Sequence, residues 1–353
     1  MDILRLGQQG RERPVARVGG DLFDLTPLTQ DVDGRWLAAG GLAATRDALQ
    51  RGALPLVEDP GHLRVGPPVA RPTAVLCIGQ NYVAHAAETG SAPPTDPIVF
   101  LKHPNTVIGP DDTVTRPAGC DTLDWEVELA VVIGRRTHRL AQRSDAADAI
   151  AGYTIANDLS DRHRQMKVSG GQWSKGKIAP GFCPVGPSLV PADEIDPSDM
   201  RIASWVNGEP RQDSTTADMI FDVAALIVDL SQYVALEAGD LILTGTPQGV
   251  ALSGRFPYLQ PGGRRRDTHR ATREPTTGHR SIGGGAAEIG DLLSGDTQPR
   301  ASAAARQRVA RRADVRGLGR LRLPTCWLAR WRRRRRRAPR PGRSDRPRPR
   351  AAR

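Results

Sequence analysis

The stretch of sequence that decides the fold is DWEVELAVVIG, residues 124–134. Its second half is apolar apart from Glu128 and is rich in valine, and it ends at a glycine. A short run of this kind is typical of a buried β-strand. Because side chains alternate between the two faces of a strand, Asp124, Glu126 and Glu128 are expected on one face.

Three carboxylates on one face of a partly buried strand need a counter-ion, because like charges that leave water destabilise one another. A cluster of carboxylate oxygens suits a hard divalent cation such as Mg²⁺, Ca²⁺ or Mn²⁺. A strand face that is open to water would show the same alternation. This segment by itself therefore leaves two interpretations open, a metal site and a solvated face.

Outward from this stretch, other short apolar runs predict a sheet. Runs rich in Val, Ile and Leu lie at 75–78, 98–101, 202–206 and 241–243, with Gly, Pro and Asp between them. The spacing of apolar residues predicts one helix over 219–230. We therefore expect a mostly β, α+β fold with few helices.

Residues 1–69 are expected to form a small N-terminal domain. Its sequence predicts strands at 2–6 and 15–18, a turn at 19–20 with continuation to 25, and a helix over 41–50. Prolines between residues 66 and 72 stiffen the connection to a catalytic domain expected over 70–262, because proline fixes φ and removes a backbone donor.

Two further segments contain residues of catalytic type. His85 and Glu88 are three residues apart, so on a helix they would meet on one face, as a general base and the carboxylate that orients it. A surface pair on a short helix has the same spacing. Asp158 ends an apolar run, where a strand would place it at the rim of a site, although Asn157-Asp158 is also typical of a turn or a helix N-cap.

Two glycine-containing segments could bind an anion. Lysines lie among the glycines of 170–177, where they could reach an anionic substrate or remain solvated loop residues. At 239–250 an apolar run leads into a Gly/Thr/Pro turn, whose exposed N–H groups and hydroxyls could hold a carboxylate or serve only as a turn.

Taken together and in this order, these segments resemble the fumarylacetoacetate hydrolase family over about residues 70–262. The order of the motifs makes the match far more specific than any single motif. The matching motifs are Ile78-Gly79-x-Asn81-Tyr82 with His85 and Glu88, Asp124-Trp125-Glu126-x-Glu128, Asn157-Asp158-x-Ser160-x-Arg162-x-x-Gln165, Gly176-Lys177, Pro184-x-Gly186-Pro187, Asn207-Gly208, and Gly239-Asp240 with Thr244-Gly245-Thr246-Pro247-x-Gly249-Val250.

The resemblance implies a rolled β-sandwich and a homodimer. It also implies a divalent cation bound by Glu126, Glu128 and Asp158, with Mg²⁺ as the first choice and Mn²⁺ or Ca²⁺ as alternatives.

The other site residues have roles that the resemblance likewise implies. His85 with Glu88 would activate a water molecule. The residues that would hold or surround the substrate are Lys177 and Thr246, on its carboxylate and keto oxygens, and Arg162 and Gln165, which would line the site.

The activity implied is hydrolysis of a C–C bond in a small acylpyruvate or other 2,4-diketo acid, with a metal that polarises the keto-acid oxygens. An isomerase, decarboxylase or lyase acting on a related oxo-acid is an alternative within the family. The N-terminal unit and the GGQW segment at 170–173 resemble the branch that hydrolyses 2,4-diketo-3-deoxy sugar acids. After Lys177 the family commonly has Ser-x-Asp-Thr-Phe, whereas this chain has IAPGF at 178–182, so an inactive family member is a further alternative.

The charge of the chain changes abruptly at residue 263. Residues 263–353 contain 27 arginines, no lysine and 7 acidic residues, a net charge of about +20, whereas the preceding residues carry about −9. Such a segment cannot bury enough apolar surface to offset its ordering entropy, so we expect a disordered basic tail. Polybasic tails bind nucleic-acid phosphates non-specifically, which is an alternative function, but the acidic body and its carboxylate motifs favour an enzyme.

The first residues of this tail fit a frameshift. The family usually continues with Asp-Val-Val-Glu and two closing strands, whereas this chain reads GRRR at 263–266. One extra G before GAC GTC GTC GAx produces GGA CGT CGT CGA, which encodes Gly-Arg-Arg-Arg. We infer that the tail is a frameshifted reading that replaces the closing strands. A clean read of this junction without the extra base in several isolates would contradict this.

The remaining composition points to a reducing cytoplasm. The four cysteines, at 77, 120, 183 and 326, form no close pair, which argues against a disulfide scaffold or a thiolate zinc site. The polar N-terminus has no apolar signal region, and no run approaches the roughly 18 apolar residues of a membrane span.

Overall fold

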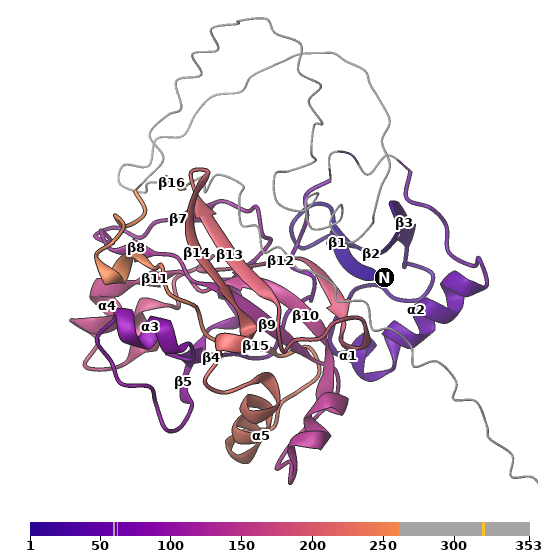
Figure 1. Ribbon diagram of the computed structural model, residues 1–353. Helices are drawn as coiled ribbons and strands as arrows, with labels where there is room; N and C mark the ends of the chain where they lie inside the picture. The colour runs from indigo at the N-terminus through magenta and orange to yellow at the C-terminus, as the bar shows by residue number, and fades with distance from the viewer. Residues whose placement is uncertain (59–60, 62, 261–319, 322–353) are drawn as a thin grey trace, which may run out of the picture.

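The computed structural model describes residues 1–58, 61, 63–260 and 320–321 (Figure 1). Its main feature is a ten-stranded sheet in the order β3-β2-β1-β12-β10-β9-β15-β4-β5, with β6 also paired to β12. The strands of this sheet are β1 (Asp2–Leu6), β2 (Arg13–Val18), β3 (Asp21–Asp24), β4 (Val75–Gly79), β5 (Ile98–Lys102), β6 (Val107–Ile108), β9 (Val127–Ile133), β10 (Ile150–Asn157), β12 (Cys183–Pro191) and β15 (Leu241–Leu243).

Short ladders and helices complete the described fold. The two-stranded ladders are β7 (Val114–Thr115) with β16 (Arg320–Leu321), β8 (Leu123–Asp124) with β11 (Ser160–Asp161), and β13 (Arg201–Val206) with β14 (Glu209–Thr215). The α-helices are α1 (Gly34–Ala38), α2 (Gly41–Gln50), α3 (Val83–Glu88), α4 (Arg162–Met166) and α5 (Val223–Tyr233). The 3₁₀ helices are η1 (Pro104–Thr106), η2 (Arg143–Ala149), η3 (Trp173–Gly176), η4 (Ala192–Glu194), η5 (Thr216–Asp218) and η6 (Ala251–Ser253). The sheet-dominated α+β fold that the sequence predicts is confirmed.

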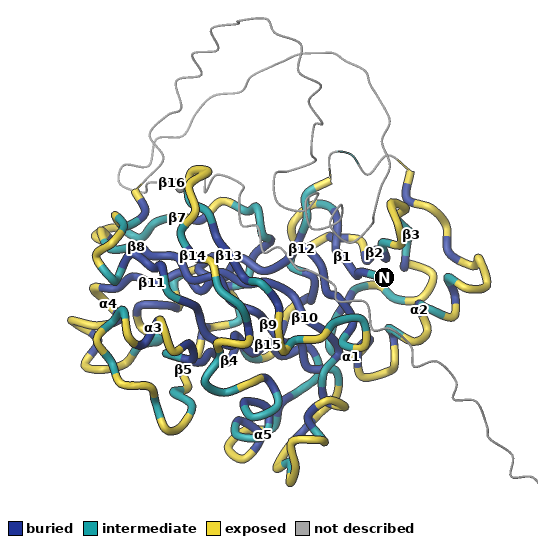
Figure 2. Tube along the Cα trace, viewed as in Figure 1, coloured by how far each residue is buried: buried dark blue, intermediate teal, exposed yellow. Residues whose placement is uncertain are grey.

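Strand β9 lies at the centre of the sheet and is buried along its whole length (Figure 2). Ala130 and Val132 pack into one apolar cluster, whereas Leu129 and Val131 pack into a second cluster on the opposite face. A strand that is covered on both faces reads as an almost unbroken apolar run, because neither face meets water. Glu128 has the same alternation phase as Ala130 and is therefore a carboxylate inside the protein.

The sheet curls around the first of these clusters. Ile3 and Ala16 come from strands near one edge of the sheet, and Phe100 comes from β5 at the other edge, yet all three contribute to the same cluster. The N-terminal strands continue the sheet, because β1 pairs with β12 at Ile3 and Leu189. This curled sheet is the rolled arrangement expected from the resemblance.

Helix α5 begins four residues later than the sequence pattern predicts, and the predicted start at 219 is wrong. The side chain of Asp222 caps the helix by accepting a hydrogen bond from the Ala225 amide. The residues before the cap are held outside the helix, because the side chain of Asn81 accepts from the Phe221 amide and donates to the Phe221 carbonyl. The other predicted helix, over 41–50, coincides with α2.

Most of the predicted disordered tail lies outside the described residues. The part that the structure describes is β16, a two-residue strand that pairs antiparallel with β7. Cys77, Cys120 and Cys183 are buried and free, as the spacing of the cysteines predicts, and Cys326 lies outside the described residues. Across the part of the chain that is described, no helix combines the length and apolar character needed to cross a bilayer.

Candidate active site

A cavity of about 260 Å³ opens beside the central strands. Its wall contains eight of the nine site residues that the sequence analysis singles out. These are His85, Glu88, Glu126, Glu128, Arg162, Gln165, Lys177 and Thr246. The ninth, Asp158, lies directly behind the wall with its side chain completely buried.

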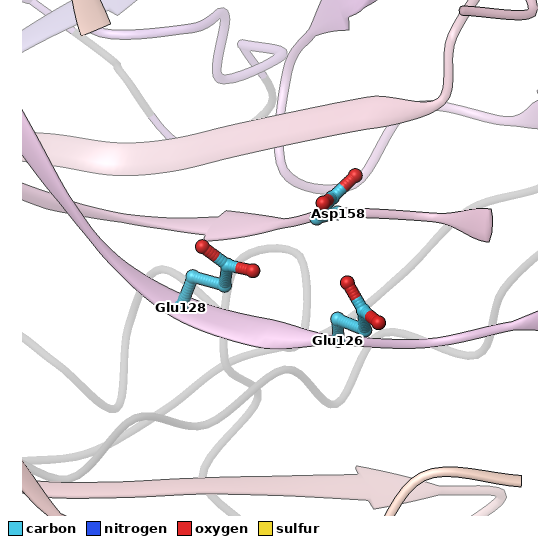
Figure 3. Close-up of side chains that lie close together, drawn as sticks. All are labelled: Glu126, Glu128 and Asp158. Atoms are coloured by element: carbon cyan, nitrogen blue, oxygen red, sulfur yellow. The ribbon is translucent and has the colours of Figure 1, made fainter. Parts of the chain in front are cut away.

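The carboxylates of Glu126, Glu128 and Asp158 converge although they come from two segments (Figure 3). One oxygen from each residue lies within 4.8 Å of the others, and all three residues are buried. Strand pairing brings them together, because β10 pairs with β9 in a register that places Ala156 opposite Glu128. The Asp158 amide then donates to the Glu126 carbonyl at 2.9 Å, immediately beyond the end of β10.

Asp124 does not join this cluster, so the prediction that it shares one strand face with Glu126 and Glu128 is wrong. The strand is interrupted at Trp125, and Asp124 belongs to the separate strand β8. Side-chain hydrogen bonds replace the ladder there. Asp124 accepts from the amides of Trp125, Ala251 and Leu252, and the Glu126 amide donates to the side chain of Asn157.

Buried cations surround the carboxylates. Lys177 Nζ lies 2.6 Å from Glu126 Oε2 and 2.7 Å from Asp158 Oδ2. Arg162 bridges Asp124 at 2.8 Å and Glu126 at 2.7 Å. The altered segment at 178–182 adds no partner to Lys177 among the hydrogen bonds of the described residues, so the lysine is held by the carboxylates themselves.

The electrostatic environment shifts the pKa values of Glu126 and Glu128 in opposite directions. Burial would raise the pKa of Glu126, but the charges of Arg162 and Lys177 outweigh burial and hold that pKa well below its usual value. Burial together with the charges of Asp158 and Glu126 raises the pKa of Glu128 well above its usual value. Within the described chain, the carboxylate of Glu128 accepts a hydrogen bond only from the Gly245 amide. An added cation would therefore stabilise the ionised form of Glu128 more than that of Glu126 or Asp158, which already have cationic partners.

His85 and Glu88 meet on one face of α3, as their spacing predicts. Nδ1 of His85 lies 3.1 Å from Glu88 Oε1. The two oxygens of Glu88 also accept from the Gly249 amide at 3.0 and 3.1 Å. A carboxylate held in this way fixes the orientation of the imidazole, and Nε2 has no hydrogen-bond partner among the described residues.

The position of Gly249 can be tested through stability. Its φ is +102°, and an added Cβ would lie 2.1 Å from the Arg211 carbonyl oxygen. We expect Gly249→Ala to lower the free energy of unfolding by about 3 kcal/mol, from backbone strain and overlap together.

Gly254 supplies the matched control for this variant. Its φ is +80°, but an added Cβ would meet no atom within 4 Å. Gly254→Ala should therefore lower the free energy of unfolding by only about 1 kcal/mol. Urea denaturation measures both, and equal losses would contradict the close approach at Gly249.

The remaining predicted residues are held by their neighbours. Arg162 donates to Gln165 Oε1 at 2.9 Å, and both side chains line the cavity. The hydroxyl of Thr246 donates to the Val127 carbonyl at 2.9 Å and accepts from Gln212 at 2.7 Å. Its proton is thus used to anchor the loop after β15 to β9.

Two residues that the sequence analysis does not identify complete the site. Lys102 is fully buried and donates to Asp158 Oδ1 at 2.6 Å. Gln212 joins the Val127 amide to the Thr246 hydroxyl. The alternation in β5 contains a signal for the lysine, because Lys102 is in phase with the apolar, inward-facing Phe100.

The curled sheet and the cavity lined with carboxylates and cations define an enzyme that acts on small molecules. A family model described as "Fumarylacetoacetate (FAA) hydrolase C-terminal" matches residues 74–277, a range that extends past residue 262. The 2,4-didehydro-3-deoxy-L-rhamnonate hydrolase of Sphingomonas sp. (strain SKA58) is 42% identical over 267 residues, which cover 74% of this chain and 90% of that relative.

Two similar solved structures differ in their reactions. A 5-carboxymethyl-2-hydroxymuconate delta-isomerase from Mycobacterium smegmatis has a TM-score of 0.57 and 32% identity, covering 71% of this chain and 89% of its own. A maleylpyruvate hydrolase from Sphingobium sp. SYK-6, in complex with manganese(II) and pyruvate, has a TM-score of 0.60 and 28% identity, covering 74% and 92%. The chain belongs to the fumarylacetoacetate hydrolase family, and the similar proteins named above include hydrolases and an isomerase.

Proposed function

We propose that this chain is a divalent-metal-dependent hydrolase that cleaves a C–C bond in a small acylpyruvate or other 2,4-diketo acid. The observation that carries the proposal is the convergence of Glu126, Glu128 and Asp158 beside a cavity that also contains the His85–Glu88 pair.

The donor atoms of the triad suit a hard cation. All are carboxylate oxygens, and a carboxylate has about four acceptor sites, of which Glu128 uses one within the described chain. The manganese ion in the related maleylpyruvate hydrolase supports the same choice. We propose Mg²⁺ or Mn²⁺ as the bound cation. Such an ion supplies Lewis-acid polarisation of the keto-acid oxygens.

The charge of the site supports an anionic substrate. In the described part of the chain, the carboxylates of Asp124, Glu126, Glu128 and Asp158 face three cationic side chains, those of Lys102, Arg162 and Lys177. A divalent cation would add two positive charges to those of Arg162 and Lys177 in the cavity wall, which favours binding of a carboxylate.

In the proposed reaction, His85 removes a proton from water through Nε2, because its Nδ1 is turned toward Glu88. The water oxygen bonds to the carbonyl carbon C4 of the diketo acid, and the C3–C4 bond breaks. One product is a carboxylic acid, and the other is pyruvate, whose C3 takes up the proton that His85 removed from water. Lys177 and Arg162 lie where they can stabilise the oxygens that gain negative charge.

The rest of the cavity wall is uncharged and combines polar with apolar side chains, so it favours a substrate whose far end is uncharged and carries hydroxyl groups. Gln80, Thr89, Ser91 and Ser253 line it with amide and hydroxyl groups. A second carboxylate on the substrate would lose its hydration there without gaining an unpaired cation from the described wall. Together with the likeness to the rhamnonate hydrolase, this supports a 2,4-diketo-3-deoxy sugar acid as the substrate.

The direct test is release of pyruvate. We expect the purified chain with Mg²⁺ or Mn²⁺ to release pyruvate from 2,4-diketo-3-deoxy sugar acids, and removal of the metal by a chelator to lower the rate at least ~100-fold. A coupled assay for pyruvate measures both. Turnover that is indifferent to the chelator would contradict a metal-dependent reaction.

Isomerisation or decarboxylation of a related oxo-acid is the second candidate, because one similar structure is an isomerase. The His85–Glu88 pair could move a proton between carbon atoms without a water molecule. Product analysis of the same assay separates the reactions, since hydrolysis alone yields two acids. A chain without turnover on any of these substrates, with metal bound, would be an inactive member.

The quaternary structure and the tail remain proposals as well. We propose a homodimer, which light scattering of the purified chain tests. Non-specific binding of nucleic acid by the Arg-rich segment is tested by comparing the full chain with one that ends at residue 262. Binding that survives this truncation would assign it to the acidic body instead.

A further inference from the structure

We infer that Lys102 is a positioning residue that lets Asp158 offer only one oxygen to a cation, and that the site thereby prefers Mg²⁺ and Mn²⁺ to Ca²⁺. The inference rests on the proposed function, because it takes Glu126, Glu128 and Asp158 as the ligands.

The two lysines that hold Asp158 differ in their position. Lys102 is the last residue of β5, its side chain is fully buried, and its ammonium is absent from the cavity wall. Lys177 belongs to that wall and lies 4.7 Å from the centre of the Phe100 ring. Lys177 thus holds Asp158 from the cavity wall, whereas Lys102 holds it from outside that wall.

Each lysine holds a different oxygen of Asp158. Lys102 donates to Oδ1 at 2.6 Å, and Lys177 donates to Oδ2 at 2.7 Å. Lys177 also donates to Glu126 Oε2, so Oδ2 is the oxygen on the side of the triad. We take Oδ2 as the oxygen that faces the other ligands, because Lys177 of the cavity wall holds it together with Glu126, whereas Lys102, which is not part of that wall, holds Oδ1.

Lys102 holds Asp158 in a fixed position. Its Nζ also donates to the Leu159 carbonyl at 3.1 Å, so it holds two consecutive residues. Its backbone is paired with Val75 in the sheet. Turning Asp158 so that both oxygens reached one cation would break the bond to Oδ1 and leave a buried ammonium poorly paired, which is strongly unfavourable.

A carboxylate restricted to one oxygen selects among cations. Mg²⁺ requires nearly octahedral coordination by about six oxygens at short distance, whereas Ca²⁺ takes about six to eight and often uses both oxygens of a carboxylate. Mn²⁺ also suits octahedral oxygen ligands. Because Lys102 keeps the second oxygen of Asp158 away from the cation, it disfavours binding of Ca²⁺, the larger ion.

The experiment is calorimetric titration of the metal-free full chain with Mg²⁺, Mn²⁺ and Ca²⁺, each alone. We expect the wild type to bind Mg²⁺ and Mn²⁺ at least ~10-fold more tightly than Ca²⁺, and Lys102→Met to reduce this preference at least ~10-fold. Loss of one positive charge by itself would strengthen binding of all three ions alike. The ratio of the Mg²⁺ affinity to the Ca²⁺ affinity therefore distinguishes a change in how Asp158 coordinates the ion from the loss of a positive charge. Lys167→Met, at an exposed lysine, is the matched control and should leave the ratio unchanged.

Each outcome decides the inference. A wild type that binds Ca²⁺ as tightly as Mg²⁺ overturns it, even if Lys102→Met does not fold, and leaves the proposed hydrolase standing. An unchanged ratio in a folded Lys102→Met variant also overturns it. If none of the three ions binds the wild type, the proposed metal-dependent function fails together with the inference.

Discussion

Replacing Glu128 with glutamine is expected to abolish metal-dependent turnover, with a fall in metal affinity of at least ~100-fold. Glutamine has nearly the same volume, and its side-chain oxygen can still accept the hydrogen bond from the Gly245 amide. It removes one negative charge from the three ligands that would hold the cation. Calorimetry of Mg²⁺ binding and the pyruvate assay measure the two losses separately.

The same variant should fold at least as well as the wild type when no metal is present. Burial and the charges of Asp158 and Glu126 raise the pKa of Glu128, so its ionised form is unfavourable in the metal-free protein. A neutral amide removes this repulsion, and thermal unfolding in chelator should show an unchanged or higher midpoint. Turnover and metal affinity that both stay at wild-type level would show that the cation site lies elsewhere.

Asp229 provides the control for Glu128→Gln. It lies on α5, and burial together with the charge of Asp96 raises its pKa as well. It is absent from the cavity wall. Asp229→Asn should leave metal affinity and turnover unchanged. A loss seen only in Glu128→Gln would then be due to the position of Glu128, and not to the removal of an acid with a raised pKa.

Replacing His85 with glutamine has the second-largest expected effect, a fall in kcat of about 10²–10⁴-fold with metal affinity retained. His85 is buried in the cavity wall and is held by Glu88, which is itself held by the Gly249 amide. Glutamine can keep a hydrogen bond to Glu88 but cannot take a proton from water. The variant should therefore bind metal and substrate normally and fail in the chemical step.

Steady-state kinetics at saturating metal, with calorimetry for the metal itself, distinguish this outcome from a structural defect. His163 is an exposed histidine in α4 that lies outside the cavity wall, and His163→Gln should keep the wild-type kcat. A His85→Gln variant with wild-type kcat would remove the base from the proposed reaction. Loss of metal binding instead would assign His85 to the cation site.

Local patterns in the sequence predicted the structure correctly where the interaction is between residues close together in the chain. The His85–Glu88 contact follows from a three-residue spacing on one helix, and the unbroken apolar run of β9 follows from burial of both its faces. Local patterns failed where distant groups compete with the backbone. Asn81 bonds to Phe221 and delays the start of α5, and Asn157 accepts from the Glu126 amide where the strand is interrupted.

The sequence by itself determined the apolar runs, the likeness to one enzyme family and the identity of the acidic residues, because each depends on residue type and short spacing. The resemblance implies that Asp158 meets Glu126 and Glu128, but no local pattern does, and only the tertiary structure brings the three together, through the register between β9 and β10. The buried contact between the Lys102 ammonium and Asp158 also appears only in the tertiary structure. The physical reason is that strand register and burial are set by the packing of the whole sheet, which no short stretch of residues contains.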